Sequence, residues 1–129
     1  KGHVDIVACF APDGRLLLHR QTDEAHPDHL LWAELSRQFS QEGIDVIALP
    51  APATLKDNRD WVDYSYINHY VCNGAVVCPG FGDRADDAAR EILSESYPNR
   101  DVVVLESRAL FAMGGGIHCI TQQQPRQID

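Results

Sequence analysis

A short pattern that occurs twice constrains the fold of this chain more than any other feature of its sequence. Asp13-Gly14 and Asn73-Gly74 are signals of tight hairpin turns, and their glycines stand 60 positions apart. Apolar, strand-like runs flank each turn, an amphipathic helical stretch follows, and another apolar run closes the segment. The pattern predicts an α/β fold with one strand–strand–helix–strand unit over about residues 3–49 and a second over about residues 66–105.

The elements of the two units can be placed by residue number. Strands are expected at residues 4–10, 15–20, 44–49, 66–72, 75–79 and 102–105. Helices are expected at about 28–42, with Asp28 as the N-cap, and at about 84–97, with Asp83 as the cap. Repeats of this period indicate a propeller-like assembly, in which two units leave the ring incomplete and sheet edges open. The polar, proline-marked stretch 50–61 lies between the units, and loops of this length often carry function.

Composition and charge exclude several classes of protein. The 129 residues are 44% hydrophobic and 23% charged, which is typical of a globular domain. Acidic residues outnumber basic ones by 19 to 11, and this argues against a nucleic-acid partner, since such proteins usually show a basic face. The apolar runs are too short to span a bilayer, so we expect no membrane partner. A net charge of −8 is compatible with a cationic substrate.

The cysteines indicate reduced thiols. No two of Cys9, Cys72, Cys78 and Cys119 form a CxxC pair, so we expect no zinc site. The first three lie in apolar, strand-like runs, where cysteine behaves as a small hydrophobic residue. A chain with so few cysteines is not a disulfide framework, and we therefore expect a cytoplasmic protein.

Cys119 differs from the other three because a run of glycines precedes it. Gly114, Gly115 and Gly116 remove side chains just before the thiol, so the backbone there can approach a ligand closely. A cysteine that emerges from such a loop onto a strand is placed like a nucleophile. We expect the neighbouring His118 to point away from the cleft and to support the loop, since adjacent side chains alternate along a strand. A tight glycine turn with a buried cysteine is the alternative interpretation.

His3 and Asp5 form the second candidate site. They are two positions apart, so in a strand their side chains project from the same face. An imidazole beside a carboxylate offers both proton transfer and cation binding. Together with Cys119, the pair is typical of a Cys/His enzyme whose carboxylate holds a positive group. The alternative is a solvated strand entry with two polar residues.

Three segments in a fixed order carry a resemblance to a known family: Gly2-His3-Val4-Asp5, then Ser65-Tyr66-Ile67-Asn68 followed by Asn73-Gly74-Ala75, and last the stretch 114–125, which reads GGGIHCITQQQP. Together they resemble the agmatine deiminases, which are grouped with the bacterial-type peptidyl-arginine deiminases. The resemblance implies the pentein fold, with five strand–strand–helix–strand units around a pseudo-fivefold axis. Family members are much longer, so residues 1–129 would be their C-terminal part, with two units and a catalytic cysteine strand at 114–125.

The resemblance also implies a chemistry. Cys119 matches the nucleophile, His3 the general acid and base, and Asp5 a carboxylate that holds the guanidinium, while Gly114–Gly116 would line the substrate. The implied reaction hydrolyses agmatine to N-carbamoylputrescine and ammonia, a step of putrescine biosynthesis, through a covalent thiouronium and with no metal or other cofactor. Cys9 stands where the resemblance leads us to expect arginine.

Partners and alternatives follow from the same comparison. A small cationic guanidine is the expected substrate, either agmatine or a peptidyl-arginine or other guanidine. The second carboxylate would come from missing N-terminal units or, within this chain, from the stretch 57–63. The open ring predicts association with the missing N-terminal part or with another copy, and a fragment without activity of its own is the remaining alternative.

Overall fold

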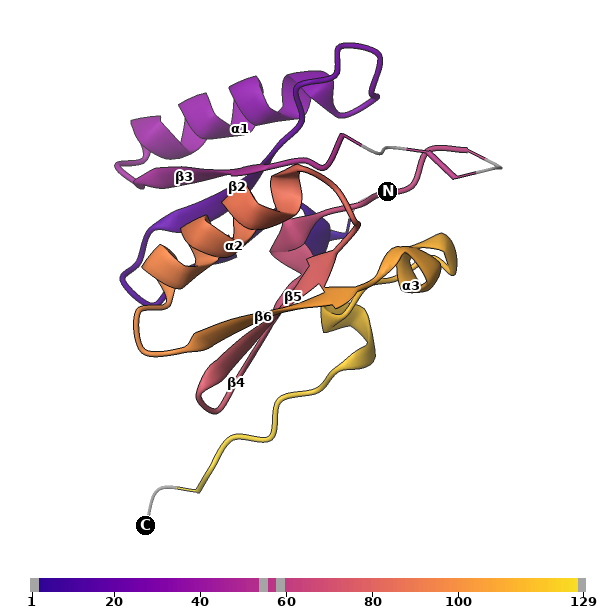
Figure 1. Ribbon diagram of the computed structural model, residues 1–129. Coiled ribbons are helices and arrows are strands. Elements are labelled where there is room, and N and C mark those ends of the chain that lie inside the picture. Colours follow the sequence, from indigo (N-terminus) through magenta and orange to yellow (C-terminus); the bar gives the residue numbers. More distant parts are fainter. Residues whose placement is uncertain (1–2, 54–55, 58–59, 128–129) are drawn as a thin grey trace.

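Two three-stranded sheets form the body of the chain (Figure 1). The structure, a computed structural model, describes residues 3–53, 56–57 and 60–127, so Gly2 of the first motif lies outside the described residues. In the first sheet, β1 (Ala8–Phe10) pairs antiparallel with β2 (Leu16–Arg20), and β2 pairs parallel with β3 (Val46–Pro50). The second sheet repeats this order and these directions with β4 (Tyr70–Cys72), β5 (Ala75–Gly80) and β6 (Asp101–Glu106). The α/β fold class is confirmed.

Each parallel pair of strands is joined through a helix. Helix α1 (His29–Gln41) connects β2 to β3, and α2 (Ala85–Ser96) connects β5 to β6. Both lie within two residues of their expected ends. Asp28 is the N-cap residue of α1, whereas the N-cap position of α2 is Arg84, and Asp83 one residue earlier accepts a hydrogen bond from the Ala85 amide.

The first strand of each unit begins later than expected, and a single 3-10 turn takes its place. These turns are η1 (Val4–Ile6) before β1 and η2 (Tyr66–Asn68) before β4. Ser65 joins them, because its hydroxyl donates to the Ile6 carbonyl at 2.8 Å and accepts from the Ile67 amide at 3.2 Å. The expected strands at 4–10 and 66–72 are therefore wrong in their first halves, and the same departure occurs in both units.

The segment around Cys119 also differs from the prediction. A short helix, α3 (Arg108–Ala112), follows β6, and Cys119 lies in the 3-10 turn η3 (His118–Ile120). The residues 121–127 have no regular secondary structure. The expected strand at 114–125 is wrong, because the segment pairs with neither sheet and its backbone folds back at the glycine run.

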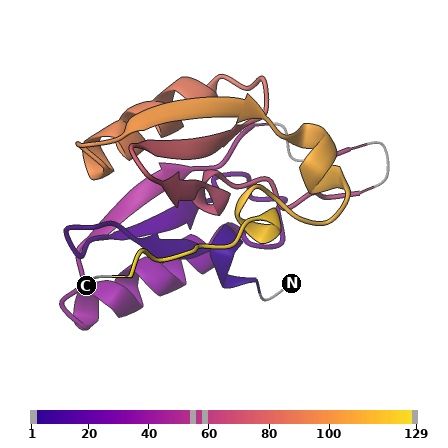
Figure 2. The same ribbon diagram turned by 90° about the horizontal axis from the view of Figure 1, so that it is seen from below.

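One core is shared by both units. Phe81 is fully buried at its centre and contacts the rings of Tyr64, Tyr66 and Phe111. Leu17 and Leu49 of the first sheet pack into the same cluster as Val76 and Leu93 of the second unit. Figure 2 shows the consequence for the site: η3 lies beside η1, between the two units. In the described part of the chain, no helix has the length and apolar character needed to cross a membrane.

Candidate active site

A cavity of about 260 Å³ opens where the 3-10 turns η1 and η3, the glycine run and the loop before η2 meet. All six residues that the sequence singles out line it: His3, Asp5, Gly114, Gly115, Gly116 and Cys119. His3 and Asp5 reach the cavity from a 3-10 turn and not, as expected, from one face of a strand. Asp5 lies within η1 and His3 caps that turn, so no strand alternation sets their directions.

Cys119 is the exposed cysteine of the four. Its thiol donates to Asp5 Oδ2 across 3.3 Å, which joins two residues 114 positions apart in the sequence. Burial raises the pKa of Cys9 to about 11 and that of Cys78 to about 12, so both thiols stay protonated near neutral pH. The Cys9 sulfur lies 3.9 Å from His69 Nε2, and Cys9 is not among the residues that line the cavity.

Asp5 receives two hydrogen bonds on one oxygen. Besides the Cys119 thiol, the His118 ring nitrogen Nδ1 lies 2.9 Å from Asp5 Oδ2. Burial raises the pKa of Asp5, but the hydrogen bonds from His118 and Cys119 more than offset it and hold the pKa below its usual value. The carboxylate is therefore charged at neutral pH and available to a cation.

The sequence predicts that His118 points away from the cleft; His118 does not line the cavity, but its ring contacts Asp5, which does. Residues 118–120 form a 3-10 turn, in which successive side chains are separated by about 120° rather than by the half-turn of a strand. The ring therefore reaches the carboxylate while staying outside the residues that line the cavity. His118 lies at the edge of the site rather than behind its loop.

Asn68 is the buried polar residue that sequence reasoning did not assign to the site. Its side chain is fully buried, and its Nδ2 lies 3.4 Å from Cys119 Sγ and 3.1 Å from the Asp5 carbonyl. Its Oδ1 accepts a hydrogen bond from the His118 amide at 2.9 Å. The only sequence signal was an asparagine within an otherwise apolar run, as part of the Ser65–Asn68 motif.

The loop before η2 supplies acidic groups to the cavity lining. Asp57, Asp60 and Asp63 line the cavity together with Trp61. The Trp61 amide donates to Asp60 at 2.8 Å, and the Lys56 ammonium lies 4.0 Å from the centre of the Trp61 ring. Among residues 3–53, 56–57 and 60–127, no three His, Cys, Asp or Glu side chains gather in a way that could hold a metal ion.

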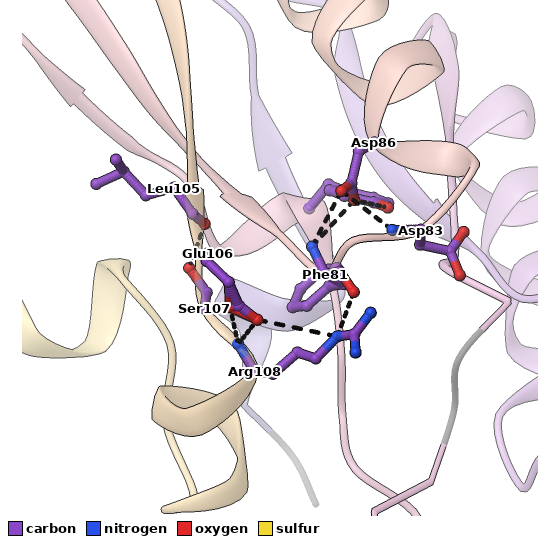
Figure 3. Close-up of polar contacts among 8 residues, drawn as sticks. Phe81, Asp83, Asp86, Leu105, Glu106, Ser107 and Arg108 are labelled. Atoms are coloured by element: carbon purple, nitrogen blue, oxygen red, sulfur yellow. Dashed lines mark hydrogen bonds and ion pairs between the residues drawn. The ribbon is translucent and has the colours of Figure 1, made fainter.

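Phe81 fixes the start of the segment that leads to Cys119 (Figure 3). Its backbone amide donates to Asp86 at the beginning of α2, and its carbonyl accepts from the Arg108 side chain at the beginning of α3. The Arg108 amide in turn donates to Glu106 at 3.2 Å. Helix α3 is thereby attached to the core by its first residue, and the glycine run starts from a fixed point.

Comparison with known proteins identifies relatives along almost all of the chain. The sequence model of the Porphyromonas-type peptidyl-arginine deiminase family matches residues 1–125. A Streptomyces coelicolor protein, provisionally named an agmatine deiminase, is 50% identical over 133 residues, which cover 98% of this chain and 39% of that protein. The agmatine deiminase of Stutzerimonas stutzeri is 34% identical over 148 residues, which cover 96% of this chain and 40% of the relative.

Solved structures show the same fold. The agmatine deiminase of Enterococcus faecalis, in a structure described as catalyzing its reaction, superposes with a TM-score of 0.88 at 27% identity. The match covers 98% of this chain and 41% of that one. The chain thus spans about two-fifths of the length of the relatives it matches. The covered fraction does not say which part of each relative is matched, so the placement of this chain at their C-terminal end stays a prediction. Since a family model accounts for residues 1–125, the chain belongs to the Porphyromonas-type peptidyl-arginine deiminase family.

Proposed function

We propose that this chain carries the nucleophile, the acid–base group and one cation-binding carboxylate of an enzyme that hydrolyses guanidinium groups, with agmatine as its substrate. One observation carries the proposal: the Cys119 thiol and the Asp5 carboxylate are 3.3 Å apart on the wall of a cavity that His3 also lines. A thiol beside a charged carboxylate suits a cationic electrophile, because the cation is attracted to the carboxylate and offsets the charge of the thiolate.

The reaction has two halves. The Cys119 thiolate attacks the guanidinium carbon and forms a C–S bond, and the C–N bond to the departing nitrogen breaks as His3 gives that nitrogen a proton. Ammonia leaves and a thiouronium remains on Cys119. His3 then takes a proton from water, whose oxygen attacks the same carbon. The C–S bond breaks, so that the thiolate is restored and the guanidinium has become a ureido group.

Agmatine is favoured over a peptidyl-arginine by the charge of the cavity. Agmatine carries an amine at the end opposite its guanidinium, whereas the far end of an arginine side chain is a neutral peptide. Asp57, Asp60 and Asp63 also line the cavity, and an acidic lining attracts a second positive charge. The relatives named agmatine deiminase agree with this choice. N-carbamoylputrescine and ammonia are then the products, and putrescine biosynthesis is the use of the reaction.

The rest of the catalytic ring is part of the same proposal. Two strand–strand–helix–strand units make up part of a pentein-type ring, and the remaining units add further contacts to the guanidinium. A planar cation is held best by carboxylates on more than one side, and loss of positioning alone can cost orders of magnitude in rate. We therefore expect the isolated chain to bind guanidines weakly and to turn them over slowly.

Alkylation by a cationic reagent tests the recognition step without the missing units. Chloroacetamidine is a planar amidinium, and chloroacetamide is its neutral counterpart; each loses chloride as the cysteine forms a C–S bond. We expect Cys119 to react faster with the amidinium, agmatine to protect it, and Asp5→Asn to reduce the preference about tenfold, the effect of one lost charge contact of ordinary size. Asp87→Asn, an exposed change on α2, should leave the preference as it is. Equal preference in the wild type and Asp5→Asn would contradict the proposal.

Turnover is tested in a complete ring. This chain can replace the matching residues of the Stutzerimonas stutzeri relative, and ammonia and ureido product can then be measured from agmatine and from an N-acylated arginine amide. We expect turnover of agmatine by the folded hybrid and none by its Cys119→Ser form. Faster turnover of the arginine amide would transfer the proposal to peptidyl-arginine.

A further inference from the structure

We propose that Asn68 is the positioning residue of the nucleophile: its amide donates to the Cys119 sulfur and ties the Asp5 and Cys119 segments together, so that the thiolate forms at a fixed distance from the carboxylate. The meaning of this role for guanidine hydrolysis rests on the proposed function of Cys119. The contact itself can be tested without any guanidine.

The orientation of the Asn68 amide is set by its surroundings. The His118 backbone N–H is a donor only, so the atom of Asn68 that lies 2.9 Å from it must be the oxygen. The nitrogen therefore faces the other way, where the Asp5 carbonyl, an acceptor only, lies at 3.1 Å. Its second hydrogen is left for Cys119 Sγ at 3.4 Å. Two neighbours thus fix independently which end of the amide meets the sulfur.

Burial makes these contacts costly to lose. Asn68 has no exposed surface, and a buried amide that loses its hydrogen-bond partners is left with an uncompensated cost of desolvation. Gly116 also packs closely against this amide, since a Cβ on Gly116 would lie 2.1 Å from Asn68 Oδ1. The glycine thus lets the chain pass close against the amide. The surrounding structure therefore holds the side chain in one place.

Charge explains why the sulfur needs a donor there. In the resting site the Cys119 thiol donates to Asp5 Oδ2, which stabilises the thiol and not the thiolate. Removing its proton leaves two negative groups 3.3 Å apart. A hydrogen bond from Nδ2 of Asn68 to the sulfur becomes charge-assisted at that moment and offsets part of the repulsion. His118 acts on the carboxylate oxygen of the same pair, whereas Asn68 acts on the sulfur.

The first experiment replaces Asn68 by a side chain of the same shape without a donor. In Asn68→Leu, we expect iodoacetamide to alkylate Cys119 about tenfold more slowly at neutral pH, and the profile of alkylation rate against pH to move upward by about one unit, the change that corresponds to a tenfold loss of thiolate. The control is Ser65→Ala, which removes the hydrogen bonds that join η1 to η2 but does not touch the sulfur. It should lower stability and leave the profile unchanged. A folded Asn68→Leu chain with the wild-type profile would overturn the proposal.

The second experiment needs no change at Asn68, and so it does not depend on whether that variant folds. The side-chain amide signals of Asn68 can be followed by NMR as the pH is raised through the range in which alkylation of Cys119 accelerates. We expect them to shift in the wild type and to stay in place in Cys119→Ser, which has no thiol to titrate. The same titration in both chains would overturn the proposal.

The two proposals fail separately. Iodoacetamide carries no charge, so its rates report on Asn68 and the sulfur whatever the natural substrate is. A chain that shows the Asn68 effect without preference for chloroacetamidine loses the proposed function and keeps this contact. The opposite result leaves guanidine recognition in place and removes Asn68 from it.

Discussion

Three adjacent glycines meet three different requirements at the site. Gly114 has a φ of +95°, in the left-handed region that side chains disfavour. Gly115 lies beneath the nucleophile, so a Cβ there would be 3.7 Å from Cys119 Sγ. Gly116 passes the buried amide of Asn68 and the ring of Phe111. The run is therefore more than a flexible hinge, since two of its members leave room for named neighbours.

Gly116→Ala should be the most damaging of the single-methyl changes in this run. Its Cβ would lie 2.1 Å from Asn68 Oδ1 and 2.6 Å from Phe111 Cζ, and both of these neighbours are buried. We expect a loss of about 1–3 kcal/mol of unfolding free energy, as for overpacking in a core, together with slower alkylation of Cys119. Urea denaturation gives the energy. Gly115→Ala is the comparison, since its nearest neighbour is the exposed Cys119 at 3.3 Å. Equal stability of Gly116→Ala and the wild type would refute the close contact.

His19 should make the stability of the chain depend on pH. Burial, with a smaller effect of the nearby His26, lowers the pKa of His19 from 6.5 to about 4. The unfolded chain therefore binds more protons between these values, so the contribution of His19 is complete above pH 6.5 and is lost as the pH falls toward 4. We expect a loss of about 2 kcal/mol between pH 7 and pH 5, measured by urea denaturation.

A variant at the same position isolates that effect. The His19 ring lies with Nδ1 3.1 Å from the Ser65 hydroxyl, and an asparagine amide can occupy the place of that nitrogen without titrating. His19→Asn should remove most of the difference between the two pH values. If the variant keeps the whole pH dependence, another group is responsible.

At the scale of the elements, local pattern was sufficient where an element is regular and insufficient where its end is set from outside. The hairpin turns, both helices and β5 follow from periodicity and from turn residues. The 3-10 starts of both units do not, because Ser65 holds η2 against Ile6, 59 positions away in sequence. An alternating run cannot record such a contact.

The site shows the same division. The six residues singled out in the sequence could be predicted because they belong to distinctive motifs, and they do line one cavity. The strands that were expected to hold them are 3-10 turns instead. Asn68 was not predicted as part of it, because an asparagine inside an apolar run has no local partner to indicate its role. Its three contacts are with Asp5, His118 and Cys119, which only the packing of the two units brings near.

Asp86 joins three elements, and its loss should loosen all of them. Its carboxylate accepts from the Phe81 amide at 3.1 Å, from the Asp83 amide at 3.2 Å and from the Tyr66 hydroxyl at 2.7 Å. Asp86→Asn keeps the shape but replaces one acceptor by a donor. We expect a loss of about 1–3 kcal/mol of unfolding free energy.

The matched control for Asp86 stands next to it. Asp87 lies in the same first turn of α2 and is exposed, so Asp87→Asn shares the effect on the helix dipole without the buried contacts. Thermal or urea unfolding should show a clearly smaller change for Asp87→Asn. Equal effects of the two variants would mean that the charge at the helix start matters and that the three contacts do not.

At the scale of the whole molecule, the outer face of β6 should promote association. Val103 is 45% exposed and Leu105 is 49% exposed, while the alternating residues Val102 and Val104 pack against the core. β6 is also an edge strand of its sheet. We expect the isolated chain to associate with itself or with the remaining part of a ring, and Val103→Lys to weaken that association by placing a charge on the edge.

Sedimentation velocity at several concentrations measures this directly. Leu30→Lys is the control, because Leu30 is 74% exposed but lies on α1, away from the sheet edge. It should sediment like the wild type, with Val103→Lys shifted toward the monomer. A wild-type chain that stays monomeric at every concentration would remove the basis for an open edge.

The hydrogen bonds around Cys119 join groups made at different times during protein synthesis. Asp5 and Asn68 precede Cys119 by 114 and 51 residues, so a ribosome adds the residues of both sheets before it adds the thiol. Chains are made at about 5–20 residues per second, and domains generally fold as units while they emerge. Cys119 is the most exposed of the four cysteines and therefore the one most open to oxidation. It is added to the chain only after the residues that form hydrogen bonds with its sulfur have been made.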